Sequence, residues 1–421
     1  MLDPILNQAM RTQTGAFRSS PISSLTVASG LKPLSTYREI KTLNYYLRTA
    51  VNKTNPLYQQ IQSDNELPRL APTDEGESLE RKTLLQRAEI LMRKYNINLR
   101  TVREEDVPEY PPWVEGNLTV CQELDDCQKN QQSAHLLKGI FLEHLRSHQD
   151  SITLYTDGSK TDTGVGFAVV GGGCDISRRI NGTASVFTAE LLAILEAVEQ
   201  SQRMVGEITT IITDSKSSIQ AINRLYHDNP IVQEIKKAIR NSNKDVKLCW
   251  VPSHVGVPGN ENADSSAREA TTSPTIHRTP LPRSDIKCNI KQKAHTFWKQ
   301  RWQQESPTNK LREITATTSL LPNSSCADRE WERGLVRLRI GHCHLTHSHL
   351  MAGGQPPECE DCNTIVTVKH IILECPSFEN QRRRFFPNYR ADMKYFLNEA
   401  DTSYGGPLYS FVKEINLLNN L

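Results

Sequence analysis

Residues Ser151–Ser159 read SITLYTDGS, and we expect the rest of the chain to be organised around this run. Aliphatic and β-branched side chains between positions 152 and 156 predict a short buried strand. The predicted strand ends on Asp157, and Gly158 follows directly. An aspartate before a glycine is most often only a turn-forming side chain. The significance of Asp157 therefore depends on what the next hundred residues contain.

Four later segments have the composition of strands, and they are Gly164–Val170, Ile176–Asn181, Ile208–Thr213 and Lys247–Val251. One of them is again followed by an acid, Asp214. Helices that begin near Val186 and Asn262 carry Glu190 and Asp264 close to their starts, where an acid is often only a macrodipole or capping group. Open α/β sheets, however, place their sites where strands end and helices begin. We therefore expect the four acids to converge on one edge of a sheet.

Four converging carboxylates indicate a particular chemistry. Buried together without a cation they would repel one another, and the pKa of each would rise. Ligand sets made only of oxygen suit hard cations such as Mg²⁺ or Mn²⁺. Two such ions about 3.5–4 Å apart stabilise both the attacking and the leaving oxygen in phosphoryl displacement. The pattern therefore favours metal-dependent phosphoryl chemistry.

The same segment resembles a type 1 ribonuclease H domain. The matching blocks are TDGS at Thr156–Ser159, TAEL at Thr188–Leu191, TDSKS at Thr213–Ser217 and VPSHVGVPGNENAD at Val251–Asp264. The resemblance implies an α/β fold with a five-stranded mixed sheet flanked by helices. It also implies that Asp157, Glu190, Asp214 and Asp264 bind two Mg²⁺ or Mn²⁺ ions. His254, on a loop, would assist proton transfer or product release, a role that suits a group titrating near neutral pH. The alternative for His254 is an ordinary exposed loop histidine.

The activity implied by this resemblance is endonucleolytic cleavage of the RNA strand of an RNA–DNA hybrid, with the 2′-OH distinguishing RNA from DNA. Some family members carry an extra basic helix, but only a few residues lie between Tyr226 and Pro230 here. Residues 151–275 carry 12 basic and 14 acidic side chains, a net charge of −2. We therefore expect flanking regions to supply part of the affinity for the hybrid, and an isolated 151–275 fragment to bind it weakly.

The C-terminal region contains a second candidate site, formed by Cys359, Cys362, His370 and Cys375. Thiolate and imidazole ligands in a set of four suit tetrahedral Zn²⁺. The alternative is unliganded cysteines on a loop and a helix. A nearby run of histidines lacks such partners and is interpreted as surface or helix-face residues: His342, His344, His347 and His349.

Residues 276–421 carry 20 basic and 15 acidic side chains, a net charge of +5. The arginines of Trp331–Ile340 (WERGLVRLRI) and Arg382–Arg384 are therefore candidates for contacts with phosphates. The alternative is a solvated helix face. The two interpretations are about equally supported by the sequence.

The order of the parts also resembles the C-terminal end of non-LTR retrotransposon polyproteins, in which a ribonuclease H domain precedes a Cys-Cys-His-Cys knuckle. The N-terminal stretch Leu2–Leu25 resembles the segment that follows the polymerase core in those proteins. A paired-aspartate polymerase motif is not found in the sequence. A metal-dependent nuclease is therefore expected. The alternatives are a non-catalytic nucleic-acid-binding remnant of a retrotransposon reverse transcriptase and a structural domain of a larger polymerase.

The 421 residues, 37% of them hydrophobic, predict two or three domains. No signal peptide and no membrane-spanning segment is indicated, so we expect a nuclear or cytoplasmic protein whose cysteines are thiols or metal ligands. Nucleic acid is the expected partner, and the sequence does not indicate a protein partner. The expected organisation is a helical region (1–62), a linker with short helices (63–148), a ribonuclease H domain (149–274), a helical linker (275–330), a zinc-knuckle region (331–385) and a C-terminal tail (386–421).

Overall fold

The structure is a computed structural model that describes residues 2–66, 82–105, 111, 116, 118–121, 134–146, 151–321, 328–387 and 392–421. Much of the expected linker at 63–148 and part of the one at 275–330 lie outside these residues. The described chain forms two compact units. We call Thr42–Lys291 the sheet unit, and Met1–Lys41 together with Gln292–Leu421 the helical unit.

The α-helices are α1 (Asp3–Thr14), α2 (Ile22–Ser29), α3 (Leu34–Val51), α4 (Tyr58–Glu66), α5 (Leu84–Tyr95), α6 (Ala134–Arg146), α7 (Val186–Ser201), α8 (Lys216–Asn223), α9 (Pro230–Arg240), α10 (Pro258–Ala270), α11 (Arg283–Gln303), α12 (Lys310–Ile314), α13 (Arg329–Ile340), α14 (His344–His347), α15 (His349–Ala352), α16 (Glu379–Phe385) and α17 (Pro407–Glu414). Short 3₁₀ or π turns are η2 (Leu99–Thr101), η3 (His370–Glu374), η4 (Pro376–Phe378), η5 (Tyr395–Glu399) and η6 (Leu418–Asn420). The strands are β1 (Leu118–Cys121), β2 (Ile152–Lys160), β3 (Val165–Gly171), β4 (Cys174–Ile180), β5 (Ile208–Thr213) and β6 (Asp245–Trp250).

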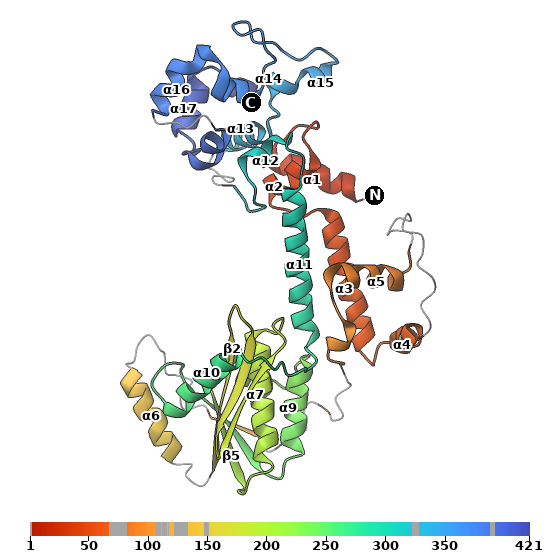
Figure 1. The fold of residues 1–421 in the computed structure, drawn as a ribbon, viewed down its shortest axis with the longest axis vertical. Coiled ribbons are helices and arrows are strands. Elements are labelled where there is room, and N and C mark those ends of the chain that lie inside the picture. Colours follow the sequence, from red (N-terminus) through yellow and green to blue (C-terminus); the bar gives the residue numbers. More distant parts are fainter. Residues whose placement is uncertain are drawn as a thin grey trace. The chain divides into compact units, whose positions relative to one another are not determined.

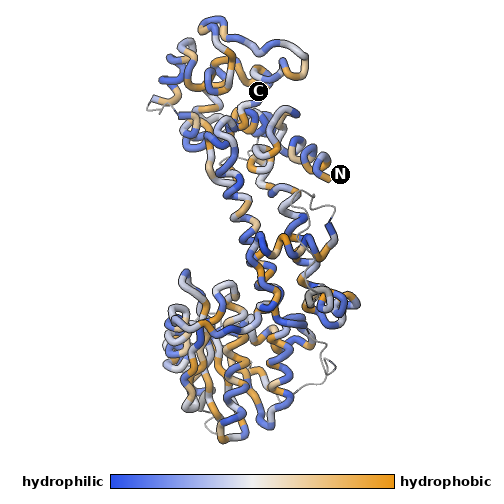
Figure 2. The backbone as a smooth tube through the Cα atoms, turned by 45° about the vertical axis from the view of Figure 1, so that its right-hand side comes forward, coloured by the Kyte–Doolittle hydropathy of each residue, from blue (hydrophilic) through white to orange (hydrophobic). Residues whose placement is uncertain are grey.

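The sheet unit is built on a mixed six-stranded sheet in the order β1-β6-β5-β2-β3-β4. Strands β2, β5, β6 and β1 run parallel, β3 pairs antiparallel with β2, and β4 pairs antiparallel with β3. Helices α7 and α9 cover one face, and α6 and α10 lie on the other (Figure 1). The strands are rich in hydrophobic residues because both faces are covered (Figure 2). The α/β fold expected from the sequence is confirmed, and β1 adds a sixth strand to the expected five.

The tertiary structure corrects the role expected for Gly158. Strand β2 does not end at Asp157 but continues to Lys160, pairing with β3 so that Asp157 faces Ala168 across the ladder. Gly158 is required for a different reason than a turn. A Cβ at this position would lie 2.5 Å from the backbone nitrogen of Glu190, so only glycine lets α7 approach the strand this closely.

We expect Gly158→Ala to lower the free energy of unfolding of the sheet unit by about 3 kcal/mol, because the added methyl group meets helix backbone that cannot rotate away. Gly182→Ala is the matched control, since no atom lies within 4 Å of the Cβ it would add. Chemical denaturation of the two variants measures the difference. Equal stability of the two variants would contradict this account of the strand–helix contact.

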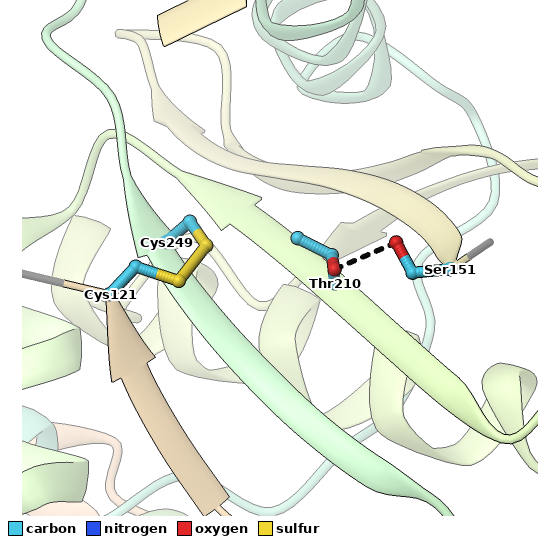
Figure 3. The surroundings of a disulfide bond; sticks show 4 residues. All are labelled: Cys121, Ser151, Thr210 and Cys249. Atoms are coloured by element: carbon cyan, nitrogen blue, oxygen red, sulfur yellow. Dashed lines mark hydrogen bonds between the residues drawn. A yellow bond between two sulfur atoms is a disulfide. The ribbon is translucent and has the colours of Figure 1, made fainter. Parts of the chain in front are cut away.

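Two segments from the expected linker belong to the sheet unit. Strand β1 pairs in parallel with β6, and α6 packs its Phe141 side chain into the unit with no exposed surface. The expectation that cysteines stay free is wrong for one pair, because Cys121 and Cys249 form a disulfide (Figure 3). They are direct neighbours in the β1–β6 register, with Cα atoms 4.9 Å apart. A 151–275 fragment lacks β1 and α6, so it is a poor test of hybrid affinity.

The helical unit joins the two ends of the chain. Met10 and Leu25 from the N-terminal helices share a buried cluster with Trp298, Trp302 and Val336. The expected tail at 386–421 is part of a second buried core, whose aromatic members are Trp331, Phe386, Phe396 and Phe411. Apolar side chains from the N-terminal region, the 275–330 segment and the 386–421 segment are therefore buried within one unit.

The arginines expected to contact phosphates are mostly structural. Arg339 is 2% exposed and donates to the carbonyl of Leu397 at 2.9 Å. Arg382 is 1% exposed and donates to the carbonyl of Cys375 at 2.6 Å. Arg384 is exposed but pairs with Glu414 at 3.0 Å. Both sequence interpretations are wrong for the two buried arginines, because the guanidinium groups satisfy backbone carbonyls inside the fold.

Among the described helices, none has the length and apolar character of a bilayer span.

Candidate functional site

The β2–β5 register brings the first two candidate acids together. Thr156 pairs with Thr213 in this parallel ladder, so Asp157 and Asp214 follow neighbouring positions. Glu190 reaches these two acids from the second turn of α7. Ser185 caps the N-terminus of this helix, and its side chain accepts a hydrogen bond from the backbone N–H of Thr188. Asp157, Glu190 and Asp214 each offer a carboxylate oxygen, and these three oxygens lie within 4.8 Å of one another.

The electrostatics of this acidic cluster favour a cation. Burial, followed by the charges of Asp214 and Asp264, raises the pKa of Asp157 to about 7. Burial and then the charge of Asp157 raise the pKa of Glu190 well above its ordinary value. Glu190 Oε2 is buried and has no hydrogen-bond partner. An unsatisfied carboxylate oxygen among other carboxylates fits a hard divalent ion such as Mg²⁺ or Mn²⁺.

The raised pKa of Asp157 has a consequence for stability. A carboxyl group whose pKa rises on folding favours the folded state below its unfolded pKa, and this contribution is lost as the pH rises through the folded value. Metal-free protein should therefore lose stability between about pH 4 and pH 7 through Asp157. We expect Asp157→Asn to raise the free energy of unfolding at pH 8 in EDTA by about 2–4 kcal/mol, because the buried charge is removed.

Urea denaturation at pH 5 and pH 8 measures this effect, and the gain from Asp157→Asn should be larger at pH 8. Asp162→Asn is the control, since Asp162 is an exposed acid in the same region of the chain. Added Mg²⁺ should stabilise the wild type more than Asp157→Asn. A variant that is no more stable than the wild type at pH 8 would contradict the assigned repulsion.

Asp264 and His254 form a second group beside the first. His254, Glu261 and Asp264 each offer a ligand atom, and these atoms lie within 4.8 Å of one another. The charge of Asp264 contributes to the raised pKa values of Asp157 and Glu190, so Asp264 interacts electrostatically with both of these acids. Asp264 lies in α10 and pairs with Arg268 at 3.5 Å. All four acids expected from the sequence therefore influence one site, with Asp264 on its more exposed side.

The His254 loop, which we define as residues 252–257, is held partly by a residue that the sequence analysis did not identify. The backbone N–H of Gly256 donates to Glu261 Oε1 at 3.2 Å, and Glu261 Oε2 lies 3.9 Å from His254 Nδ1. His254 itself is exposed and has a left-handed backbone with φ of +59°. The position of Glu261, one helical turn before Asp264, was the available signal.

The cysteine-rich site assembles as expected. Cys359, Cys362, His370 and Cys375 bring one ligand atom each to within 4.8 Å of one another. Interaction with the His370 side chain lowers the pKa of the Cys359 thiol to about 7, whereas burial and the neighbouring sulfur atoms raise that of Cys362 to about 12. His370 Nε2 is buried and makes no hydrogen bond of acceptable distance and angle. Three sulfur atoms around such a nitrogen fit tetrahedral Zn²⁺.

The nearby histidines only partly match their expected surface position. The rings of His342 and His347 stack with centroids 3.8 Å apart, and both are half-buried. Burial and then His347 lower the pKa of His342 to about 4, and burial and then His349 lower the pKa of His347, so both shifts favour the neutral imidazole. Within the described chain the pair does not gather with a third potential metal ligand. It is therefore a packing contact: His347 lies on a helix face in α14, as one of the expected alternatives, and neither ring is fully exposed on the surface.

Comparisons with known proteins agree with this geometry. The RNase H family model matches residues 149–272. The Retrovirus-related Pol polyprotein from type-1 retrotransposable element R1 of Popillia japonica is 26% identical over 226 residues, which are 51% of this chain and 87% of the relative. The Pol polyprotein of Ovine maedi visna related virus (strain South Africa) is 32% identical over 123 residues, 28% of this chain and 11% of the relative.

The family match covers the strands and helices that carry all four acids and His254. The Cys359, Cys362, His370 and Cys375 cluster lies outside that match and is consistent with a zinc knuckle. Residues 149–272 of this chain therefore form a ribonuclease H domain, and the chain is homologous to the Pol polyprotein of an R1 retrotransposon.

Proposed function

We propose that the chain is an endonuclease that hydrolyses the RNA strand of RNA–DNA hybrids by a two-metal-ion mechanism, and that it derives from a retrotransposon polyprotein. The observation that carries this proposal is the convergence of Asp157, Glu190 and Asp214, with a buried Glu190 oxygen that lacks a partner. Such a site is costly for the fold unless a cation balances its charge.

Asp157, Glu190, Asp214 and Asp264 would hold the two ions, which supply charge stabilisation and a water activated as a nucleophile. The pKa of Asp157, raised to about 7 by burial and neighbouring acids, makes its ionisation sensitive to the occupancy of the site. Asp264 lies on the more open side, with its side chain 26% exposed. It is the carboxylate best placed to remain accessible while substrate enters.

His254 is the proposed proton carrier. Its side chain is 67% exposed on the His254 loop, so it can meet a bound nucleic acid. A histidine at this position can donate a proton to the departing 3′ oxygen or assist release of the cut strand. Glu261, from the first turn of α10, fixes the loop through Gly256 and faces the imidazole.

Zn²⁺ at the cysteine-rich site is proposed as a structural ion. Cys375 is 1% exposed, and the buried Arg382 donates to its carbonyl, so the last ligand is built into the helical unit. The four protein ligands leave no open position for substrate. The site would therefore stabilise the helical unit without taking part in hydrolysis.

The experiment that tests the nuclease uses labelled RNA–DNA hybrid with Mg²⁺ or Mn²⁺, beside RNA–RNA and DNA–DNA duplexes. Cleavage confined to the RNA strand of the hybrid, and lost in Asp157→Asn, is the expected result. Folded protein that binds the hybrid without cutting it would favour the alternative, a non-catalytic nucleic-acid-binding remnant of a retrotransposon reverse transcriptase.

A further inference from the structure

Helix α6 lies outside the ribonuclease H match, which begins at residue 149, but contributes to the same folded unit. Its Phe141 side chain has no exposed surface. Phe141 belongs to a buried cluster with Val255 and Val257 of the His254 loop. The cluster also contains Ile212 of β5 and Val251 after β6. The helix therefore packs on the sheet and on the loop together.

Buried and exposed residues alternate along the His254 loop, as expected for a loop that packs on a helix with one side. Val255 and Val257 are 7% and 1% exposed, whereas His254 and Gly256 point outward and are exposed. The side chains of these two valines join the loop to a buried apolar cluster. The partners of these valines consequently decide where His254 is presented.

A second residue of α6 approaches the loop one turn earlier. A methyl group built on Gly256 would lie 3.6 Å from Lys138 Nζ and 3.9 Å from its Cδ. Lys138 and Phe141, three positions apart, lie on one face of the helix. On the other side, Glu261 accepts the Gly256 N–H at 3.2 Å. The loop is therefore held between α6 and α10.

The backbone of the loop explains why it needs support from both sides. His254 and Gly256 have φ values of +59° and +80°. The left-handed conformation is unfavourable for a residue with a side chain and persists only where the surroundings impose it. Loss of the backing would therefore allow the loop to leave this conformation.

We propose that α6 is a positioning element of the nuclease site, which holds the His254 loop through Phe141. This inference rests on the proposed function, because the position of His254 matters to catalysis only if the chain cuts nucleic acid. A misplacement of about 1 Å in a reacting group can cost about 100-fold in rate, so a modest shift of the loop has a measurable effect.

The first test compares full-length Phe141→Ala with Leu142→Ala, an adjacent substitution on the exposed face of the same helix. Phe141→Ala is expected to lower kcat for hybrid cleavage about 10-fold with KM changed less than about twofold, and Leu142→Ala to leave both unchanged. Phe141→Leu, which keeps most of the buried volume, should lower kcat by a smaller factor and serves if the alanine variant does not fold.

The same substitution in a His254→Ala background separates positioning from general damage. If α6 acts through His254, Phe141→Ala should lower kcat less than about twofold once His254 is gone. An equal loss in both backgrounds would overturn the proposal, because it would show that Phe141 supports the sheet rather than the loop.

A second measurement does not depend on activity. Hydrogen exchange of the amides at residues 253–257 should be at least about 10-fold faster in Phe141→Ala than in Leu142→Ala, with the β5 amides unchanged. Unchanged exchange in the loop would overturn the inference even if the wild type cuts hybrid. If the wild type cuts nothing, the proposed function fails, and the exchange result still decides whether α6 holds the loop.

Discussion

Asp214→Asn is expected to reduce cleavage of an RNA–DNA hybrid by about 1000-fold or more while the protein stays folded, because the substitution removes a ligand charge at nearly constant volume. Asp214 directly follows β5 and Asp157 lies within β2, each one position after the paired Thr213 and Thr156, and the carboxylate of Asp214 lies within 4.8 Å of those of Asp157 and Glu190. The amide cannot supply the negative charge that two cations require. Single-turnover kinetics on the hybrid, together with circular dichroism, measure the effect.

Asp228→Asn is the matched control for this substitution. Asp228 is an exposed aspartate in the same unit, on the segment between α8 and α9, and it should tolerate the amide without loss of rate. Full activity of Asp214→Asn would exclude the assigned metal site. Loss of activity accompanied by loss of the folded state would instead identify a structural role for the acid.

Cys362→Ser is expected to reduce bound zinc from about one ion per chain to a small fraction and to destabilise the helical unit, because a hydroxyl replaces one of four soft ligands. The site lies against the core of that unit, since His370 is 6% exposed and its neighbour Ile372 is fully buried in the cluster that contains Trp331. Elemental analysis of purified protein and thermal unfolding with and without a chelator measure the two effects.

Cys288→Ser provides the comparison, because Cys288 is an exposed free cysteine far along the chain from the proposed ligands. Its zinc content should equal that of the wild type. Wild-type protein that contains no zinc would exclude the site. Zinc retained in Cys362→Ser would show that a different set of ligands binds it.

The sequence determined the acids of the candidate site because their positions follow from local patterns. The period of the apolar residues indicates strands and helices, and Asp157 and Asp214 each come directly after an apolar, β-branched run. The four ligands Cys359, Cys362, His370 and Cys375 likewise come from a short stretch, in which a loop and the following η3 turn bring them together. These features depend on neighbours in the chain, so the chain alone carries the information.

Other features were decided by contacts between segments distant in sequence. Gly158 looked like part of a turn, but the close approach of α7 is what requires it. Arg339 and Arg382 looked like ligands of phosphate, but both donate to backbone carbonyls inside the helical unit. A charged side chain has the same local pattern whether its partner is solvent, nucleic acid or a buried carbonyl, so the sequence could not distinguish these cases.

The same reason explains β1 and α6, which the sequence analysis placed in a linker. A four-residue strand and a short amphipathic helix are too weak as local signals to predict where they pack. In the folded protein β1 pairs with β6, and Phe141 is buried in one cluster with Val255 and Val257 of the His254 loop. The grouping of the acids and the thiols could thus be predicted from the sequence, because neighbouring residues place them. The contacts that hold the His254 loop could not, because burial depends on which apolar surface of a distant segment packs opposite.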